Sequence, residues 1–145
     1  MQAFIIESAN RPGEFARCAA ALASRDINVA AISLGLGQRG GSAFLAADEP
    51  GARNALKTAG LKYIEVPVVT IWLDDKPGTA ARAAKRLADA DVNIELFAPV
   101  QYTNGKVTIA IGVDKVEEAR RVLSDQLTEW MVPELMHAGI GASAH

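Results

Sequence analysis

The sequence predicts an α+β protein made of two similar units, each an antiparallel sheet with its helices on one face. Three observations predict this class. The chain has 145 residues, which suits one ordinary domain or two very small ones. One segment repeats along the chain at an offset of 65 residues. Within each copy, strand-like apolar runs and helix-like patterns follow the same order.

The repeat is clearest where residues 12–29 align with residues 77–94. Nine of these 18 positions are identical, including the Pro-Gly pair that starts each segment and the Asp-x-Asn pattern near its end. A second similarity, between residues 52–56 and 119–123, follows at an offset of 67. The chain is therefore interpreted as a tandem duplication.

We expect two domains and a short tail, with the boundaries 1–66, 67–132 and 133–145. No Gly/Ser-rich or charged linker separates the units, because the apolar segment 63–73 runs across their junction. A helix-covered sheet of about 65 residues buries little apolar area by itself. The two units are therefore expected to pack side by side as one rigid body and to share a continuous sheet.

The first unit is expected to follow the order β-α-β-β-α-β. Gly, Pro and Asn residues separate its apolar runs, and Asn-Arg-Pro-Gly is expected to open the first helix. The expected elements are a strand at 4–6, a helix that ends at 26–28, strands at 29–36 and 42–47, a helix at 48–59 and a strand at 61–66.

The second unit is expected to repeat this order. An Asn-Gly pair at 104–105 is a strong hairpin signal. This order is that of the ferredoxin-like α/β sandwich, in which both helices cover one face of an antiparallel sheet. The expected elements are a strand at 67–73, a helix at 77–90, strands at 93–100 and 106–113, a helix at 115–126, a closing strand within 127–132, and an additional helical turn at 133–137 as an alternative for the C-terminus.

Composition argues against several functional classes. The net charge is −2, with 15 basic and 17 acidic residues, so clustered positive charge for non-specific nucleic-acid binding is not expected. The single Cys18 cannot form an internal disulfide, and both histidines lie within the last nine residues. We therefore expect no metal site, no cofactor and no catalytic residue. Without a signal peptide or a long apolar run, the protein is expected to be cytoplasmic, with no membrane partner.

The loop of residues 8–13 is the most informative segment, because it follows a strand and opens a helix. Backbone N–H groups at such a point can bind a carboxylate or a phosphate, and Asn10 adds an amide. The alternative is that Asn10 only caps the helix. The candidate binding residues in this loop are Ser8, Ala9, Asn10, Arg11, Pro12 and Gly13.

Asn28 and its repeat counterpart Asn93 lie between a helix end and a strand. Each either forms a helix-terminating turn or supplies a second amide to a ligand held by the loop of a neighbouring unit. The second copy of the loop carries the carboxylates of Asp74 and Asp75, so it is expected to bind a ligand carboxylate more weakly. Its candidate residues are Asp75, Lys76, Pro77 and Gly78.

The two units resemble ACT domains, the small ligand-binding modules of amino-acid metabolism, over nearly the whole chain. Residues 10–13, followed by the segment Ile27-Asn-Val-Ala-Ala31, look especially like the serine-sensing ACT domain of D-3-phosphoglycerate dehydrogenase. The resemblance implies an amino acid bound between two units, held by Asn10 and the loop of one unit and by Asn28 or Asn93 of the other. At the position where that site carries a histidine, this chain has Ser8.

Other candidates have plainer interpretations. Cys18 is expected to be a buried apolar residue, and Trp72 and Trp130 are expected to pack in a sheet or subunit interface. The paired acidic residues at 74–75 are interpreted as solvated, and the glycines of residues 35–41 as hairpin residues, because no Lys-Ser/Thr follows them.

The leading hypothesis is a non-catalytic, cytoplasmic sensor that binds an amino acid between its units. Because the chain carries no output domain, its effect would pass through a homodimer or a partner enzyme. The alternative is a regulatory subunit or interaction module of an amino-acid metabolic enzyme. A small ferredoxin-like enzyme is disfavoured, because the expected clefts hold no titratable groups beyond a pair of carboxylates.

Overall fold

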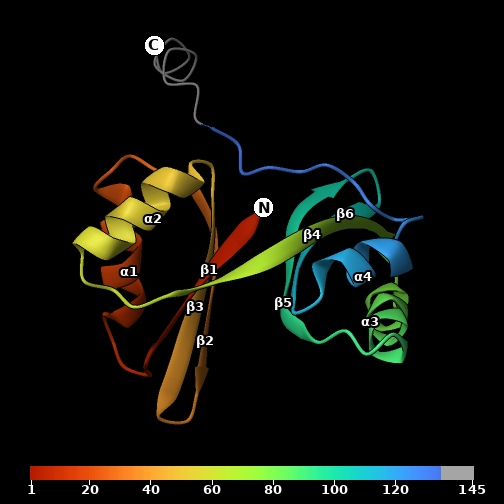
Figure 1. Ribbon diagram of the computed structural model, residues 1–145, viewed down its shortest axis with the longest axis horizontal. Helices are drawn as coiled ribbons and strands as arrows, with labels where there is room; N and C mark the ends of the chain where they lie inside the picture. Colours follow the sequence, from red (N-terminus) through yellow and green to blue (C-terminus); the bar gives the residue numbers. More distant parts are fainter. Residues whose placement is uncertain (135–145) are drawn as a thin grey trace.

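The computed structural model describes residues 1–134, which form one six-stranded antiparallel sheet and four helices (Figure 1). The strand order across the sheet is β2-β3-β1-β4-β6-β5. The elements are β1 (Gln2–Ala9), α1 (Glu14–Ala23), β2 (Val29–Leu36), β3 (Arg39–Ala46), α2 (Glu49–Thr58), β4 (Ile64–Asp74), α3 (Thr79–Asp89), β5 (Ile94–Thr103), β6 (Lys106–Val113) and α4 (Val116–Val122).

Strand β4 joins the two halves of the sheet. Its first residues, 64–67, pair with β1, and its remaining residues, 68–74, pair with β6. The strands expected at 61–66 and 67–73 are therefore one strand of 11 residues. The expected continuous sheet is confirmed, and the boundary drawn at residue 66 falls inside this strand.

The two halves of the chain arrange their strands in the same way. The N-terminal half has the order β2-β3-β1-β4, and the C-terminal half has β5-β6-β4 followed by a short segment at 126–128. That segment makes one bridge, between Leu127 and Ile71, supported by the hydrogen bond from the Thr128 N–H to the Thr70 carbonyl at 3.0 Å. The closing strand expected within 127–132 is thus much shorter, because Val132 turns away into the core between the half-sheets.

Left-handed backbone positions explain where the helices begin and end. Gly13 and Gly78 both have φ of 91°, so α1 and α3 begin one residue later, at Glu14 and Thr79. The helix expected at 77–90 is shorter for this reason. Asp26 and Asp91 carry positive φ after the same two helices, and neither Asn28 nor Asn93 does. The helix-terminating role considered for the two asparagines therefore belongs to the aspartates.

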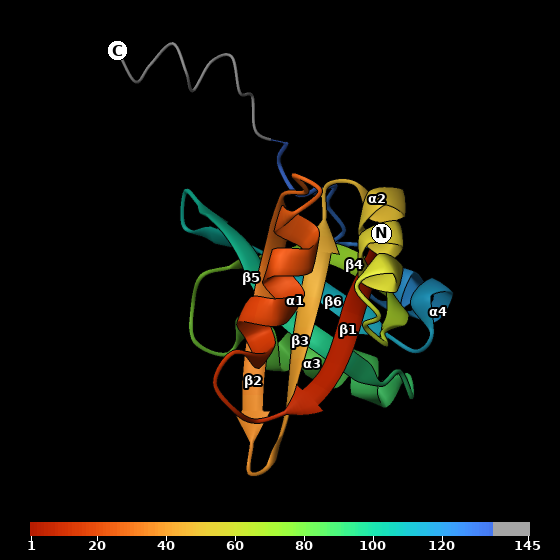
Figure 2. The ribbon, with the colours of Figure 1, turned by 90° about the vertical axis from the view of Figure 1, so that its left-hand side faces the viewer.

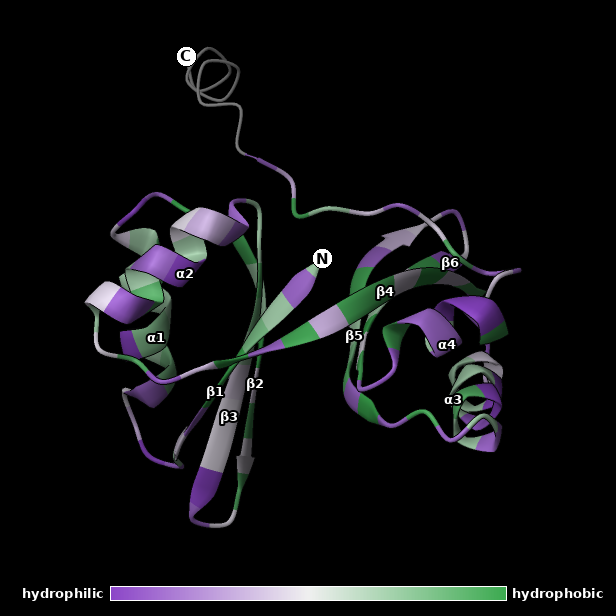
Figure 3. Ribbon diagram, viewed as in Figure 1, coloured by the Kyte–Doolittle hydropathy of each residue, from purple (hydrophilic) through white to green (hydrophobic). Residues whose placement is uncertain are grey.

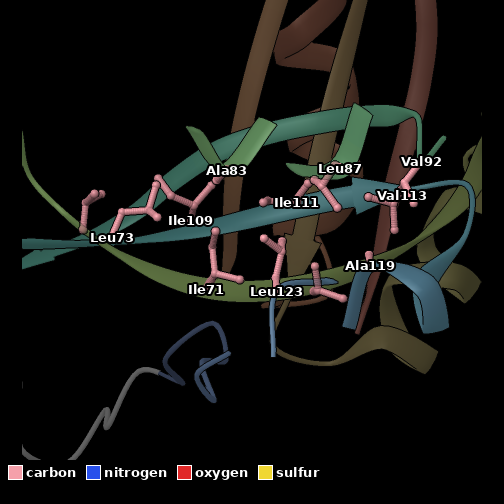
Figure 4. Close-up of a cluster of buried hydrophobic side chains, with 12 residues drawn as sticks. Ile71, Leu73, Ala83, Leu87, Val92, Ile109, Ile111, Val113, Ala119 and Leu123 are labelled. Atoms are coloured by element: carbon pink, nitrogen blue, oxygen red, sulfur yellow. The ribbon is translucent and has the colours of Figure 1, made fainter. Parts of the chain in front are cut away.

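One hydrophobic core lies under each pair of helices. In the N-terminal half, Phe4, Phe44, Leu22 and Leu56 are at most 1% exposed under α1 and α2. In the C-terminal half the corresponding cluster lies between β4, β6, α3 and α4, as Figure 4 shows, and Leu123 is fully buried there. Leu56 lies in α2 and Leu123 directly follows α4, so these two leucines are related by the offset of 67 seen in the sequence.

The sheet is strongly bent, so that its two helix-free faces turn toward each other (Figures 1 and 2). A third cluster, which includes Ala3, Leu45, Val68, Ala110 and Val132, fills part of the space between those faces. In Figure 3 the strands between the helices are largely hydrophobic, whereas the helices carry hydrophilic residues. All four helices therefore cover the outer face of one bent sheet.

The fold expected from the sequence is confirmed at the level of an α+β protein with an antiparallel sheet covered by helices on one face. The tail expected at 133–145 lies outside the described residues from residue 135 onward, as does most of the helical turn considered at 133–137.

The shared strand and the central cluster predict that both halves unfold in one transition. Leu56→Ala and Leu123→Ala should each lower the free energy of unfolding by about 2–5 kcal/mol, because each removes a fully buried side chain from one of the outer cores. Urea denaturation followed by circular dichroism and by tryptophan fluorescence measures this effect. Two separate transitions, with each substitution moving only one of them, would contradict the prediction.

Candidate ligand-binding site

The two Pro-Gly loops lie at the ends of β1 and β4, where each strand leads into a helix. In both loops the residue before the helix is a glycine, Gly13 or Gly78, and no side chain caps the helix N-terminus. By contrast, α2 is capped by Asp48, whose carboxylate accepts a hydrogen bond from the Gly51 N–H at 3.0 Å. The first turns of α1 and α3 are therefore not occupied by a capping side chain, which is the geometry that anion binding at a helix N-terminus requires.

Asn10 is fixed against the β2–β3 hairpin and does not cap α1. Its backbone N–H donates to the Gln38 carbonyl and its Nδ2 donates to the Gly37 carbonyl, both at 2.9 Å. A Cβ atom at Gly35 would lie 2.6 Å from the Asn10 Nδ2, so the glycine leaves room for the Asn10 amide to lie against the hairpin. The capping alternative considered for Asn10 is therefore wrong, and the amide is positioned by the hairpin instead.

Charges around the first loop are partly balanced. The Glu14 carboxylate, at the first position of α1, lies 2.7 Å from Nε of Arg11 and 3.0 Å from an Nη of Arg17. These hydrogen bonds, first that of Arg17 and then that of Arg11, hold the pKa of Glu14 below its ordinary value. Two guanidinium groups and one carboxylate leave this loop with a positive excess, which favours an anionic ligand group.

The second loop is less acidic than its sequence indicates. Lys106 lies 3.0 Å from the Asp74 carboxylate, and this hydrogen bond lowers the pKa of Asp74. Asp74 is thus neutralised by a residue 32 positions away, which local reading of the loop cannot find. The expected repulsion of a carboxylate rests on Asp75, whose backbone N–H donates to the Gly105 carbonyl at 2.9 Å.

Sequence reasoning missed Thr79 and Arg82 at the second loop. They occupy the repeat positions of Glu14 and Arg17, and the exchange of Glu14 for Thr79 removes the carboxylate that pairs with the arginine. Thr79 Oγ1 donates to backbone carbonyls of the loop, and Arg82 forms no ion pair with any other residue of the part described. Aligning the two copies at the offset of 65 residues could have identified both.

The structure does not bring Asn28 or Asn93 into contact with either Pro-Gly loop of the same chain. Asn28 precedes β2 and Asn10 contacts its far end, so a strand of eight residues, about 23 Å long, separates them. Asn28 Nδ2 donates to the Pro133 carbonyl at 2.5 Å, and Asn93 Nδ2 donates to the Glu95 carboxylate at 3.1 Å. Both amides thus have partners elsewhere.

A groove of about 450 Å³ lies between the two halves, and it is not among the sites expected from the sequence. Apolar side chains of β1, β2 and β5 line most of it, and charged groups stand at its rim. The alternation of apolar residues in β2 was the available signal, but the bend that brings β5 opposite β2 has no signature in the sequence. Its wall includes Ile5, Glu7, Leu34, Arg39, Gly41 and Leu96.

Three features of the described residues bear on metal binding, thiol reactivity and membrane insertion. No group of three or more His, Cys, Asp or Glu side chains in residues 1–134 could hold a metal ion. Cys18 is buried, and this burial raises the pKa of its thiol, which disfavours a reactive thiolate. None of the described helices has the length and apolar character needed to cross a bilayer.

No family model matches the chain, and no curated protein matches it. Among solved structures, protein BT0572 from Bacteroides thetaiotaomicron is 22% identical, with a TM-score of 0.72 over 88% of this chain and 90% of its own. The regulatory subunit of aspartate kinase from Thermus thermophilus, in its ligand-free form, is 25% identical, with a TM-score of 0.60 over 86% of this chain and 89% of its own.

The regulatory subunit of aspartate kinase from Thermus flavus is similar to the same degree, with 23% identity and a TM-score of 0.58 over 86% of this chain and 90% of its own. The likeness extends along nearly the full length of each of these chains. Residues 1–134 thus have the fold of ACT-type regulatory domains.

The charge cluster at the first loop predicts a specific pKa change. Arg17→Gln should raise the pKa of Glu14 toward its ordinary value of 4.5, and Arg11→Gln should raise it less, because the Arg17 hydrogen bond is the larger cause. Carboxyl chemical shifts followed by NMR across a pH titration measure this pKa. Since the pKa is lower in the folded protein, the stabilisation that it reports is complete above pH 4.5 and is lost as the pH falls through the lowered pKa.

The same titration can refute this account. If neither substitution moves the pKa of Glu14, the carboxylate is not paired as described.

Proposed function

We propose that the chain is a non-catalytic regulatory protein of amino-acid metabolism, built of two ACT-type units over residues 1–66 and 67–132. The observation that carries this proposal is the fold, which is shared nearly end to end with regulatory subunits of aspartate kinase. The match covers 89% of the Thermus thermophilus regulatory subunit. This likeness to regulatory subunits is what supports regulation without catalysis.

The ligand is proposed to be an amino acid whose carboxylate binds at the loop of residues 8–13. Three features of this loop support the assignment. The N-terminus of α1 has no side-chain cap, Arg11 and Arg17 outweigh Glu14 in charge, and the Asn10 amide is held in place by the hairpin. Oriented N–H groups with a positive excess favour a carboxylate.

The second loop, with Asp75, Lys76, Pro77 and Gly78, is proposed as the weaker or differently selective site. Its uncapped helix resembles that of the first loop, but Asp75 is a fixed negative charge in place of Asn10. Arg82 offsets part of that charge. The two loops therefore differ in selectivity through charge rather than through backbone shape, since both glycines have the same φ.

A second copy of the chain is proposed to supply the amide that one chain does not bring to its own loops. Within one chain Asn28 and Asn93 hydrogen-bond elsewhere. Strand β2 is an edge of the sheet and its residues 31–36 are exposed, so its outer backbone groups can pair with another copy. A homodimer joined at this edge would place a neighbouring unit beside the Asn10 loop.

The alternative is a regulatory subunit that acts mainly by binding an enzyme. The observation in its favour is again the near end-to-end likeness to stand-alone regulatory subunits. In that case the exposed sheet edge would meet the partner enzyme, and a ligand would be incidental. Whether the protein binds an amino acid distinguishes the sensor from a subunit that acts only by binding an enzyme.

A thermal-shift panel of the twenty amino acids tests the sensor. At a concentration 100 times its Kd, the true ligand should add about 2.7 kcal/mol to the free energy of unfolding, because it binds only the folded state. Asn10→Ala should abolish this shift, whereas Asp75→Ala should change it less. A panel without any shift would contradict ligand sensing and favour the subunit alternative, and equal effects of the two variants would contradict the asymmetry of the loops.

The edge-paired homodimer gives a separate prediction. Ala31→Lys places a charge on the exposed β2 edge, where two copies would bring like charges together, so it should shift the protein toward monomer in sedimentation velocity. Ala88→Lys, on the exposed face of α3, is the matched control and should leave the distribution unchanged. A dimer that survives Ala31→Lys is not formed at this edge.

A further inference from the structure

The groove between the half-sheets is hollowed at Gly41, on the helix-free face of the sheet. Gly41 pairs with Glu7 of β1 on one side and with Leu34 of β2 on the other. Residues paired across neighbouring strands point to the same face of the sheet. The side chains of Glu7 and Leu34 therefore flank Gly41, which has no side chain. A Cβ atom at Gly41 would meet only the Ile6 carbonyl oxygen, at 3.6 Å. The packing of the protein therefore leaves this hollow open.

The walls of the hollow are apolar and accessible. The next cross-strand row places Ile5 and Ile32 on either side of Ala43, and Leu96 closes the groove from the other half of the chain. Ile32 and Leu34 are 41% and 69% exposed. Apolar side chains that converge on an open concave space form a binding pocket for a small apolar group.

Charges of both signs stand at the rim of the groove. Arg39 and Glu7 form an ion pair there, and Glu95 lines the groove from β5, where a β-bulge interrupts the pairing with β6. The only partner of the Glu95 carboxylate among the described side chains is the Asn93 amide. The rim therefore offers one guanidinium and two carboxylates.

From this arrangement we infer that the groove is a second binding site, for an α-amino acid with an aliphatic side chain. The side chain occupies the hollow over Gly41, the carboxylate pairs with Arg39, and the ammonium group pairs with Glu7 and Glu95. A fatty acid would bring only negative charge to a rim with two carboxylates, whereas a zwitterion matches both signs. A groove of about 450 Å³ has room for such a molecule.

This site is distinct from the loop of residues 8–13. Asn10 packs against Gly35 and Gly40, which lie on the same face of the sheet as Phe4 and Phe44, under the helices. Glu7, Arg39 and Gly41 alternate with those positions and so lie on the opposite face. The two sites can therefore be changed independently.

Isothermal titration calorimetry on the full chain tests the inference, with L-leucine and glycine as the probes. Wild-type protein should bind L-leucine at least about tenfold more tightly than glycine, since only leucine fills the hollow; one buried side chain of this size supports such a ratio. Gly41→Val fills the hollow with a strand-favouring residue and should weaken leucine binding at least about tenfold. Gly41→Ala is the smaller change, to be used if the valine variant does not fold. Arg39→Gln should weaken both probes alike, because it removes the carboxylate partner.

The Asn10→Ala variant distinguishes ligand binding in the groove from ligand binding at the loop of residues 8–13. Leucine binding that survives Asn10→Ala and is lost in Gly41→Val supports the groove, whatever the loop binds. Leucine binding that survives Gly41→Val and is lost in Asn10→Ala overturns the groove and supports the loop. If the wild-type protein does not bind leucine, the groove is not an amino-acid site. If Gly41→Val changes the sedimentation of the protein but not its leucine binding, the groove is occupied by a second copy of the chain, and the inference is again overturned.

Discussion

The structure depends on one strand that belongs to both halves of the chain. Along β4, alternate side chains point to the helix-covered face, and this alternation continues without interruption from the residues that pair with β1 to those that pair with β6. Val69, Ile71 and Leu73 consequently face α3 and α4, while Val68 faces the space between the half-sheets. Because the period is fixed at two residues, the orientation of one half determines that of the other.

The two faces of the bent sheet carry different kinds of residues. The outer face carries the helices, so the uncapped starts of α1 and α3 and their charged neighbours lie on that side. The inner face has no helices, and its apolar residues either meet in the cluster around Val68 or line the groove at Gly41. The two proposed binding surfaces therefore lie on opposite faces of the sheet and differ in chemistry. One relies on backbone dipoles and charge, and the other relies mainly on apolar contact.

Much of the fold could be predicted from the sequence, because it is encoded by local signals that occur twice. The Pro-Gly loops, the hairpins and the helix faces are all short-range patterns, and the repeat reinforces each of them. What could not be predicted depends on contacts between distant residues. The pairing of Lys106 with Asp74, the contact of Asn10 with Gly35 and the shortened closing strand at Leu127 all arise from tertiary packing. The positions of the two Pro-Gly loops could be predicted from the sequence, but the distant residues that contact them could not.

The shared strand also means that the sequence repeat and the folded structure do not have the same boundary. Segments about 65 residues apart are similar in sequence, yet the boundary drawn between the two expected units lies within β4. A cut there would separate the residues that pair with β1 from those that pair with β6, and it would divide the central cluster, in which Ala3 and Leu45 pack with Val68 and Ala110. Each half would then expose apolar side chains that the other half now covers.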